Sequence, residues 1–132
     1  MKLLTRNTDY AVRAVCYMAA NRDRMVSVTE IVKNLKIPGP FLRKILQILS
    51  KKRMIKSYKG IGGGFVLVKA PNQIRLVELI SIFQGALNLN ECVFKKMLCP
   101  NMKKCPLKKK IDKIEKYVVS QLSSITIGQL IK

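Results

Sequence analysis

The sequence predicts a mainly α-helical fold with one small β hairpin, and two observations lead to this prediction. Apolar residues recur at the spacing of amphipathic helices in five stretches, at about residues 8–21, 27–35, 40–51, 76–84 and 107–122. Between the third and fourth stretches, residues 55–59 and 65–69 resemble short strands joined by a glycine-rich segment. The 132 residues are enough to bury one core without disulfides.

The first helix is predicted to begin at Thr8, which can serve as its N-cap. One face of this helix is apolar and carries Val12, Val15, Cys16 and Ala19. A lone cysteine on such a face is expected to be a small buried hydrophobe and not a metal ligand. Asp9 falls in the first turn, where a carboxylate interacts favourably with the helix dipole.

The next two helices are predicted to be joined by a tight turn. Ser27 and Glu30 form a capping box, in which the two side chains satisfy backbone amides at a helix start. Pro40 suits the first turn of the following helix, where its missing N–H costs nothing. That helix is expected to bury a stripe of apolar residues: Phe41, Leu42, Ile45, Leu46, Ile48 and Leu49. Its exposed face would then be cationic and carry Arg43, Lys44, Gln47 and Lys51.

The hairpin that follows has a glycine-rich tip, Gly60-Ile61-Gly62-Gly63-Gly64, which permits the positive φ angles of a tight turn. Lys56, Lys59 and Lys69 flank this tip in the sequence. Two helices followed by such a hairpin make a winged helix-turn-helix. A basic helix beside a basic wing suits duplex DNA, because the helix fits the major groove and the cations meet the backbone or minor groove. The candidate DNA-contacting residues are Arg43, Lys44, Gln47, Lys51, Lys56, Lys59, Gly60, Gly63 and Gly64.

The composition supports a nucleic-acid partner and disfavours other classes. Lysine and arginine total 26 against 7 acidic residues, a formal charge of +19 that would attract any polyanion. No apolar run approaches the roughly 18 residues that span a membrane, and the N-terminus lacks the apolar core of a signal peptide, so we expect a cytoplasmic protein. An enzyme is disfavoured because there is no histidine and no phosphate-binding Lys-Ser or Lys-Thr after the glycines.

Three of the four cysteines lie close together after the fourth helix. Cys92, Cys99 and Cys105 have the spacing C-x6-C-x5-C within a lysine-rich segment, and nearby cations favour the thiolate form that binds metal. Structural zinc sites prefer C-x2-C pairs and four protein ligands, whereas an iron–sulfur cluster tolerates wider spacing. We therefore expect an iron–sulfur cluster, with incidental free thiols as the alternative.

The last helix is predicted over residues 107–122, with a narrow apolar seam that continues from Leu107 through Ile111, Ile114, Val118 and Leu122. Such a seam suits pairing with one partner helix, and two copies related by a twofold axis would form a homodimer. The alternative is packing on its own domain. We expect a DNA-binding domain at 1–85, a cluster-binding loop at 86–106, and a dimerisation helix with its tail at 107–132.

In this order the parts resemble the Rrf-type winged-helix regulators, a family that includes IscR and NsrR. The markers are TDYAVRA at 8–14, FLRKILQILSKKRMIKS at 41–57, KGIGGGFVLVK at 59–69, and the three-cysteine loop before a long helix. The resemblance spans nearly the whole chain. It implies a bacterial homodimeric transcription regulator, usually a repressor, whose iron–sulfur cluster alters affinity for a palindromic operator.

The resemblance also assigns roles to individual residues. It makes Arg43, Lys44 and Gln47 candidate base or phosphate contacts, and Lys59 stands where relatives commonly have a wing arginine. The IscR branch uses a histidine as fourth cluster ligand, which this chain lacks. In the NsrR branch an aspartate of the first helix, matched by Asp9, completes a [4Fe-4S] cluster of the other subunit, so we favour [4Fe-4S] over [2Fe-2S].

The predicted function is therefore a repressor that senses nitric oxide, redox state or cluster supply. The alternative is a constitutive DNA-binding protein of the same fold with no functional cluster.

Overall fold

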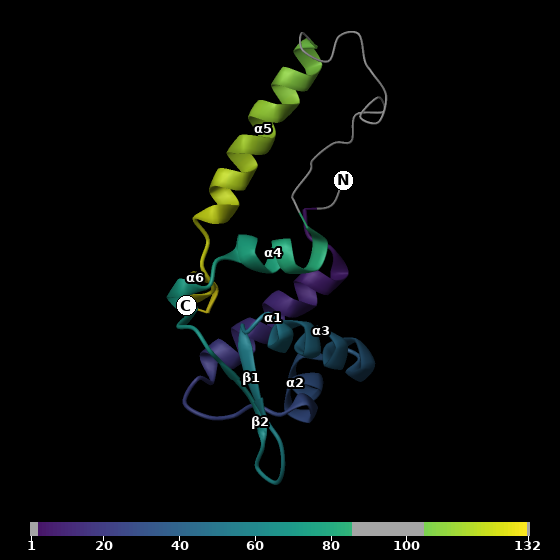
Figure 1. Ribbon diagram of the computed structural model, residues 1–132, viewed down its shortest axis with the longest axis vertical. Coiled ribbons are helices and arrows are strands. Elements are labelled where there is room, and N and C mark those ends of the chain that lie inside the picture. Colours follow the sequence, from purple (N-terminus) through teal and green to yellow (C-terminus); the bar gives the residue numbers. More distant parts are fainter. Residues whose placement is uncertain (1–2, 86–104, 132) are drawn as a thin grey trace.

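The computed structural model describes residues 3–85 and 105–131. A helical head contains most of the chain, and one long helix, α5, projects from it (Figure 1). The elements in chain order are α1 (Arg6–Ala20), α2 (Val28–Leu35), α3 (Gly39–Lys51), β1 (Ile55–Tyr58), β2 (Gly64–Leu67), the 3-10 helix η1 (Pro71–Gln73), α4 (Leu76–Gln84), α5 (Pro106–Ser123) and α6 (Ile127–Leu130). The predicted mainly helical fold with a small β wing is confirmed. Cys92 and Cys99 lie outside the described residues.

Helix α1 is the centre of the head and contacts α2, α3, α4, α6 and β2. Its inward face is buried and carries Ala11, Ala14, Val15, Met18 and Ala19. The small alanines allow neighbouring helices to approach closely, because the distance between helix axes depends on the side chains at the contact. Cys16, which we predicted to be buried, is partly buried and packs against this core.

The predicted start of α1 is wrong. The helix begins at Arg6, and its N-cap is Thr5, whose hydroxyl accepts a hydrogen bond from the backbone N–H of Thr8 at 3.3 Å. Thr8 lies inside the helix and is fully buried, where its hydroxyl donates to Oε1 of Gln84 at 2.7 Å. The same oxygen accepts the Thr5 N–H at 3.0 Å, and Nε2 of Gln84 donates to the carbonyl of Leu3 at 2.9 Å. Gln84 therefore ties the last residue of α4 to the start of α1.

The predicted capping box at the start of α2 forms only in part. The backbone N–H of Glu30 donates to Oγ of Ser27 at 3.1 Å, as expected. The Glu30 carboxylate instead accepts hydrogen bonds from Nη1 of Arg24 at 2.7 Å and from the Tyr17 hydroxyl at 2.6 Å. Hydrogen bonds from Arg24 and then from Tyr17 lower the pKa of Glu30 to about 2. This carboxylate thus joins the end of α1, the loop after it and α2.

Helix α3 buries Leu42, Ile45, Leu46 and Leu49 against the head. Phe41, which we expected inside, is 48% exposed. The buried residues follow the spacing i, i+3, i+4 and i+7 from Leu42, and Phe41 lies at the edge of that stripe in the first turn. As predicted, Pro40 occupies the first turn of this helix.

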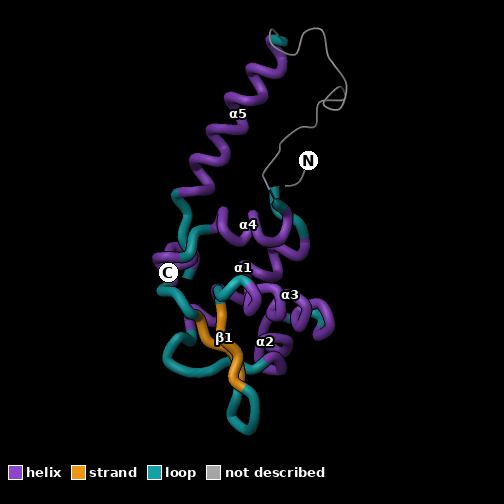
Figure 2. Tube along the Cα trace, in the orientation of Figure 1, coloured by secondary structure: helices purple, strands orange, loops and turns teal. Residues whose placement is uncertain are grey.

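Strands β1 and β2 form an antiparallel hairpin with Ile55 opposite Leu67 and Tyr58 opposite Gly64 (Figure 2). The sheet gains a single bridge where Val26 and Phe65 exchange backbone hydrogen bonds of 3.0 and 2.8 Å. This bridge explains Gly64, because a Cβ there would lie 2.7 Å from the carbonyl oxygen of Val26. The wing is thereby fixed to the loop that precedes α2.

The C-terminal part of the chain leaves the head and returns to it. Helix α5 buries none of its residues, whereas Ile127 of α6 is fully buried in the core. The return is fixed by two backbone hydrogen bonds, from Leu76 to Ile125 at 3.0 Å and from Ile127 to Ile74 at 2.9 Å. The predicted domain boundaries stay a prediction. Among the described residues, no helix is both long and apolar enough to cross a membrane.

The lowered pKa of Glu30 makes stability depend on pH. In the unfolded chain a glutamate titrates near 4.3, so the stabilisation by Glu30 is complete above about pH 5, about half lost near pH 3 and absent below about pH 2. We expect the advantage of the wild type over Glu30→Gln in urea unfolding to shrink over this window. Asp112→Asn, which removes an exposed pair with Lys108, is the control and should show a smaller change. A difference for Glu30→Gln that is constant with pH would contradict this assignment.

Candidate functional site

The outer face of α3 carries the polar residues that the sequence predicted there. Arg43, Lys44, Gln47 and Lys51 are all exposed, while the opposite face holds the helix on the head. Lys51 also lies in the last helical turn, where a cation is favoured by the helix dipole. The exposure of these four side chains is confirmed, and their contact with DNA stays a prediction.

The N-terminal end of α3 differs from its cationic face. Pro38 is the N-cap without a side-chain hydrogen bond, and Pro40 provides no N–H. Both prolines are exposed, and so is Phe41. We call Pro38, Pro40 and Phe41 the apolar tip of α3. Sequence reasoning missed it because Phe41 fits a helical apolar pattern equally well as a core residue.

The wing presents two of the predicted lysines together with an aromatic ring. Lys56 and Tyr58 lie on the same face of β1, because side chains alternate along a strand, and Nζ of Lys56 is 5.3 Å from the centroid of the Tyr58 ring. Lys59 follows at the exposed turn, and Ile61 is fully exposed at the tip. Tyr58 and Ile61 were not predicted as surface residues of the site. The alternation of β1 could have placed Tyr58.

The tip glycines have local structural reasons. Gly60 has a φ of 102°, a conformation that other residues rarely adopt. A Cβ on Gly63 would lie 2.2 Å from the carbonyl oxygen of Tyr58, so only glycine closes this turn. These requirements account for Gly60, Gly63 and Gly64 without DNA, and a role in DNA contact stays a prediction for all three.

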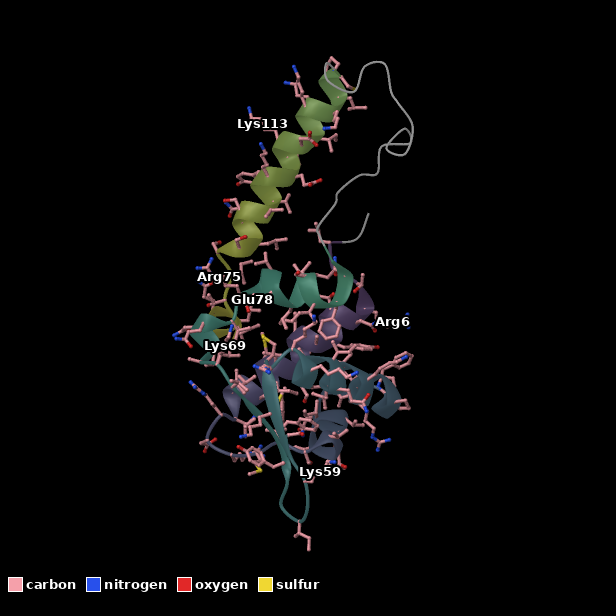
Figure 3. The ribbon with its side chains drawn as sticks, viewed as in Figure 1. Arg6, Lys59, Lys69, Arg75, Glu78 and Lys113 are labelled. Atoms are coloured by element: carbon pink, nitrogen blue, oxygen red, sulfur yellow. The ribbon has the colours of Figure 1, made fainter. Side chains whose placement is uncertain are left out.

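Lys69 does not belong with the wing tip. Figure 3 places it beside Glu78, away from Lys59, and its Nζ lies 3.6 Å from the Glu78 carboxylate. The lysine follows β2 at the end of the strand that is remote from the turn. It therefore helps to join the wing to α4.

The chain segment that contains α3 and the wing carries charge of one sign. Residues 31–77, which include most of α2, all of α3 and the wing, contain eleven lysines and arginines and no acidic residue. The acids that bound this segment are Glu30 and Glu78, and both make ion pairs. The surface of α3 and the wing is thus cationic without local compensation from its own segment, which favours a polyanionic ligand.

The predicted cluster ligands that the structure describes lie on two separate elements. Asp9 lies in the first turn of α1, its side chain is 43% exposed, and its carboxylate is 3.2 Å from Nε of Arg13. Cys105 is a free, partly exposed thiol at the N-cap of α5. Helix α5 begins at the end of the molecule remote from α1 (Figure 1). Among residues 3–85 and 105–131, no group of three potential ligands is close enough to hold a metal ion.

Cys16 differs chemically from Cys105. It is packed beside the core, and burial raises the pKa of its thiol. A raised pKa disfavours the thiolate that would bind iron or zinc. The described structure therefore supports Cys16 as a packing residue.

The predicted dimerisation seam on α5 is incompletely covered within one chain. Ile111, Val118 and Leu122 are partly buried, Ile114 is 52% exposed, and α5 contacts the head through α4. Tyr117, one helical turn after Ile114, is 67% exposed and widens the apolar surface. Packing on its own domain thus covers only part of the seam. The use of the remainder in dimerisation stays a prediction.

A comparison with protein families finds a match over nearly the whole chain. Residues 4–132 match the family model Rrf2, which describes an iron-dependent transcriptional regulator. The matched range includes the winged helix-turn-helix, the cysteine segment and the C-terminal helices.

Curated proteins give similar relatives. The chain is 36% identical over 124 residues to a protein of Aquifex aeolicus (strain VF5) named as an HTH-type transcriptional regulator, with 92% of this chain and 86% of that protein covered. It is 29% identical over 130 residues to the HTH-type transcriptional regulator NsrR of Bacillus licheniformis, with 97% of this chain and 91% of NsrR covered.

Solved structures share the fold. CymR, described as the global cysteine regulator of B. subtilis, has a TM-score of 0.84 at 20% identity, with 99% of this chain and 97% of CymR covered. T. potens IscR has a TM-score of 0.77 at 23% identity, with 99% and 86% covered. At these sequence identities the two structures show only that the fold is shared.

Proposed function

Because the chain belongs to the Rrf2 family of DNA-binding transcriptional regulators, we propose that it is a homodimeric repressor whose affinity for a palindromic operator is controlled by an iron–sulfur cluster. Family membership makes it a regulator and not an enzyme. The observation that carries the DNA-binding part is the exposed cationic face of α3 beside the wing, in a segment of 47 residues without an acid, residues 31–77. We assign its action to the cytoplasm, where a bacterial operator lies.

In the proposed complex α3 enters the major groove and the wing follows the backbone towards the minor groove. Arg43, Lys44 and Gln47 project from the exposed face of α3 and can reach base edges or phosphates. Three further lysines would contact phosphates: Lys51, Lys56 and Lys59. The glycines at the wing tip add no side chains that would keep the wing backbone away from DNA.

A palindromic operator requires two reading heads related by a twofold axis. Helix α5 is the element that can join them, because its apolar side chains continue beyond what α4 covers. Pairing of two such helices through Ile111, Ile114, Val118 and Leu122 would bury this surface without changing the head. Lys109, Lys113 and Lys116 lie on the opposite side of α5 by helical spacing and would remain in solvent.

The proposed cluster ligands are Cys92, Cys99 and Cys105 with Asp9 of the partner subunit. Three thiolates and one carboxylate suit an iron–sulfur cluster, and we favour [4Fe-4S] over [2Fe-2S]. The exposed Asp9 carboxylate is held by Arg13 at i+4, a kind of pair worth only about 0.3–0.5 kcal/mol, so exchanging this partner costs little. A bound cluster supplies a centre that reacts with nitric oxide or oxidants.

The contacts of Gln84 offer a physical link between the cysteine segment and the reading head. The cysteine segment, residues 86–106, follows Gly85 in the sequence. The neighbouring Gln84 bonds to Thr5 and Thr8 at the start of α1. The first turn of α1 also carries Asp9. Helix α1 in turn contacts α3. A change in the cysteine segment could thus shift α1 and α3 together. A coupling of about 1–3 kcal/mol between the two cluster states would give roughly 5- to 150-fold regulation.

The second candidate is a constitutive DNA-binding protein of the same fold without a functional cluster. One observation favours it. Asp9 and Cys105, the two proposed ligands that lie within the described residues, belong to separate elements, and the Asp9 carboxylate is paired with Arg13. Iron content after anaerobic purification separates the two candidates.

Salt dependence of DNA binding tests the wing. Each phosphate contact contributes about 0.9 to the slope of log affinity against log salt, so Lys59→Ala should lower the slope by about 0.9 for each subunit. Lys113→Ala is the matched control, because Lys113 lies on α5 at the other end of the molecule (Figure 3). Fluorescence anisotropy with a duplex at several salt concentrations measures both. Equal slopes for the two variants would remove Lys59 from the interface.

The cluster is tested by anaerobic purification of the wild type and three variants. We expect iron in the wild type, its loss in Cys105→Ser, and its retention in Cys16→Ser, because the Cys16 thiol is partly buried beside the core. Asp9→Asn should keep iron and change the Mössbauer spectrum. Operator affinity should differ about 5- to 150-fold between the cluster-containing and cluster-free wild type. An iron-free wild type, or identical binding curves, would favour the constitutive candidate.

The dimer is tested by placing a charge on the α5 seam. Ile114→Glu should weaken self-association by about 100-fold or more, since an unpaired carboxylate would be buried between the helices. Lys113→Glu, one residue away on the opposite face, should leave the dimer intact. Sedimentation velocity at several concentrations measures both, and a stable Ile114→Glu dimer would exclude this seam.

A further inference from the structure

The apolar tip of α3 is unexplained by packing. Phe41 is 48% exposed and lies outside the core, which is filled from this helix by Leu42, Ile45, Leu46 and Leu49. A phenylalanine side chain is large, and leaving half of it in water forgoes much of the stabilisation that burial would provide. Its neighbours Pro38 and Pro40 are exposed as well. Three apolar residues thus gather at one end of an otherwise cationic helix face.

The same end is poor in hydrogen-bond donors. A helix N-terminus ordinarily offers free backbone N–H groups to a phosphate, often helped by a polar N-cap. Here the N-cap is Pro38, which has no N–H and makes no side-chain cap, and Pro40 removes another N–H. In the first turn, backbone N–H groups remain at Gly39 and Phe41, and the N–H of Leu42 donates to the Pro38 carbonyl at 3.0 Å. The end of α3 thus offers a phosphate fewer donors than an ordinary helix N-terminus does, and it exposes three apolar residues.

In a helix-turn-helix the first residues of the second helix meet the base edges. On those edges the major groove offers one apolar group, the 5-methyl group of thymine. Lys44 lies one turn after Phe41, and Gln47 follows one turn later on the exposed face, so a base or phosphate contact by either would bring Phe41 close to the groove floor.

We infer that the apolar tip reads thymine methyl groups, with Phe41 as the residue that makes the contact and determines specificity. The inference rests on the proposed docking of α3 and adds to it the chemistry of the bases selected. Arg43, Lys44 and Gln47 supply polar contacts, and the tip requires a thymine at a defined position of each half-site.

Replacing thymine by uracil tests this directly, because uracil keeps the same base pair and lacks only the methyl group. The probe is the palindromic duplex that the purified wild-type protein enriches from a random DNA library. Each thymine is replaced in turn, symmetrically in both half-sites, and affinity is measured by fluorescence anisotropy. Loss of one buried methyl contact weakens binding about fourfold, so we expect about 15-fold for the symmetric pair.

The variant Phe41→Ala should bind the thymine duplex more weakly and should no longer distinguish it from the uracil duplex at that position. Lys44→Ala is the matched control from the same helix, and it should weaken binding to both duplexes equally and keep their ratio. Thermal unfolding followed by circular dichroism should give nearly the same midpoint for Phe41→Ala as for the wild type, because the side chain is outside the core.

The outcomes separate this inference from the proposed function. An enriched palindrome that the wild type binds equally well with thymine or uracil overturns the inference and leaves the repressor intact. Discrimination that persists in Phe41→Ala also overturns it, because another residue then reads the methyl group. If no sequence is enriched, both the inference and the proposed operator recognition fail.

Discussion

The burial of α1 is the constraint on which the rest of the structure depends. Its alanine-rich face is buried, and α2, α3, α4 and α6 all contact α1, so one element positions these four helices. Polar bonds at its two ends fix its direction. At the first turn Thr5 and Thr8 are bonded to Gln84, and near the last turn Tyr17 donates to Glu30. Moving α1 would therefore disturb both the helix-turn-helix and the C-terminal end of α4.

The surface of α3 and the wing offers DNA both long-range charge attraction and short-range contacts. In the proposed complex, the long-range attraction for DNA would come from residues 31–77, which contain no acidic residue, and it would act on any duplex. In the proposed complex, selectivity would come from short-range contacts at the exposed face of α3, where Arg43 and Gln47 offer hydrogen bonds and Phe41 offers an apolar surface. The wing adds Lys56 and Lys59 on a hairpin that its backbone pairing with Val26 holds close to the start of α2.

A single chain leaves two of its features incomplete. The apolar seam of α5 continues past the area that α4 covers, and Asp9 and Cys105 belong to elements that one chain keeps apart. Both features would be resolved in the proposed dimer, since a second α5 would cover Ile114 and a second head would bring its Asp9 to the cysteine segment. Dimerisation and cluster binding would then depend on each other.

The sequence by itself determined the helices, the hairpin and the outward face of α3, because these follow from local periodicity and from glycine and proline positions. Only the tertiary structure decided where Thr8, Glu30 and Phe41 go. Thr8 is held by Gln84, 76 residues away, and Glu30 turns to Arg24 and Tyr17 instead of its own helix end. Phe41 fits the apolar pattern, yet the core is already filled by its neighbours. Partners that are distant along the chain, and the volume available between helices, leave no trace in a local pattern, so these positions required the folded chain.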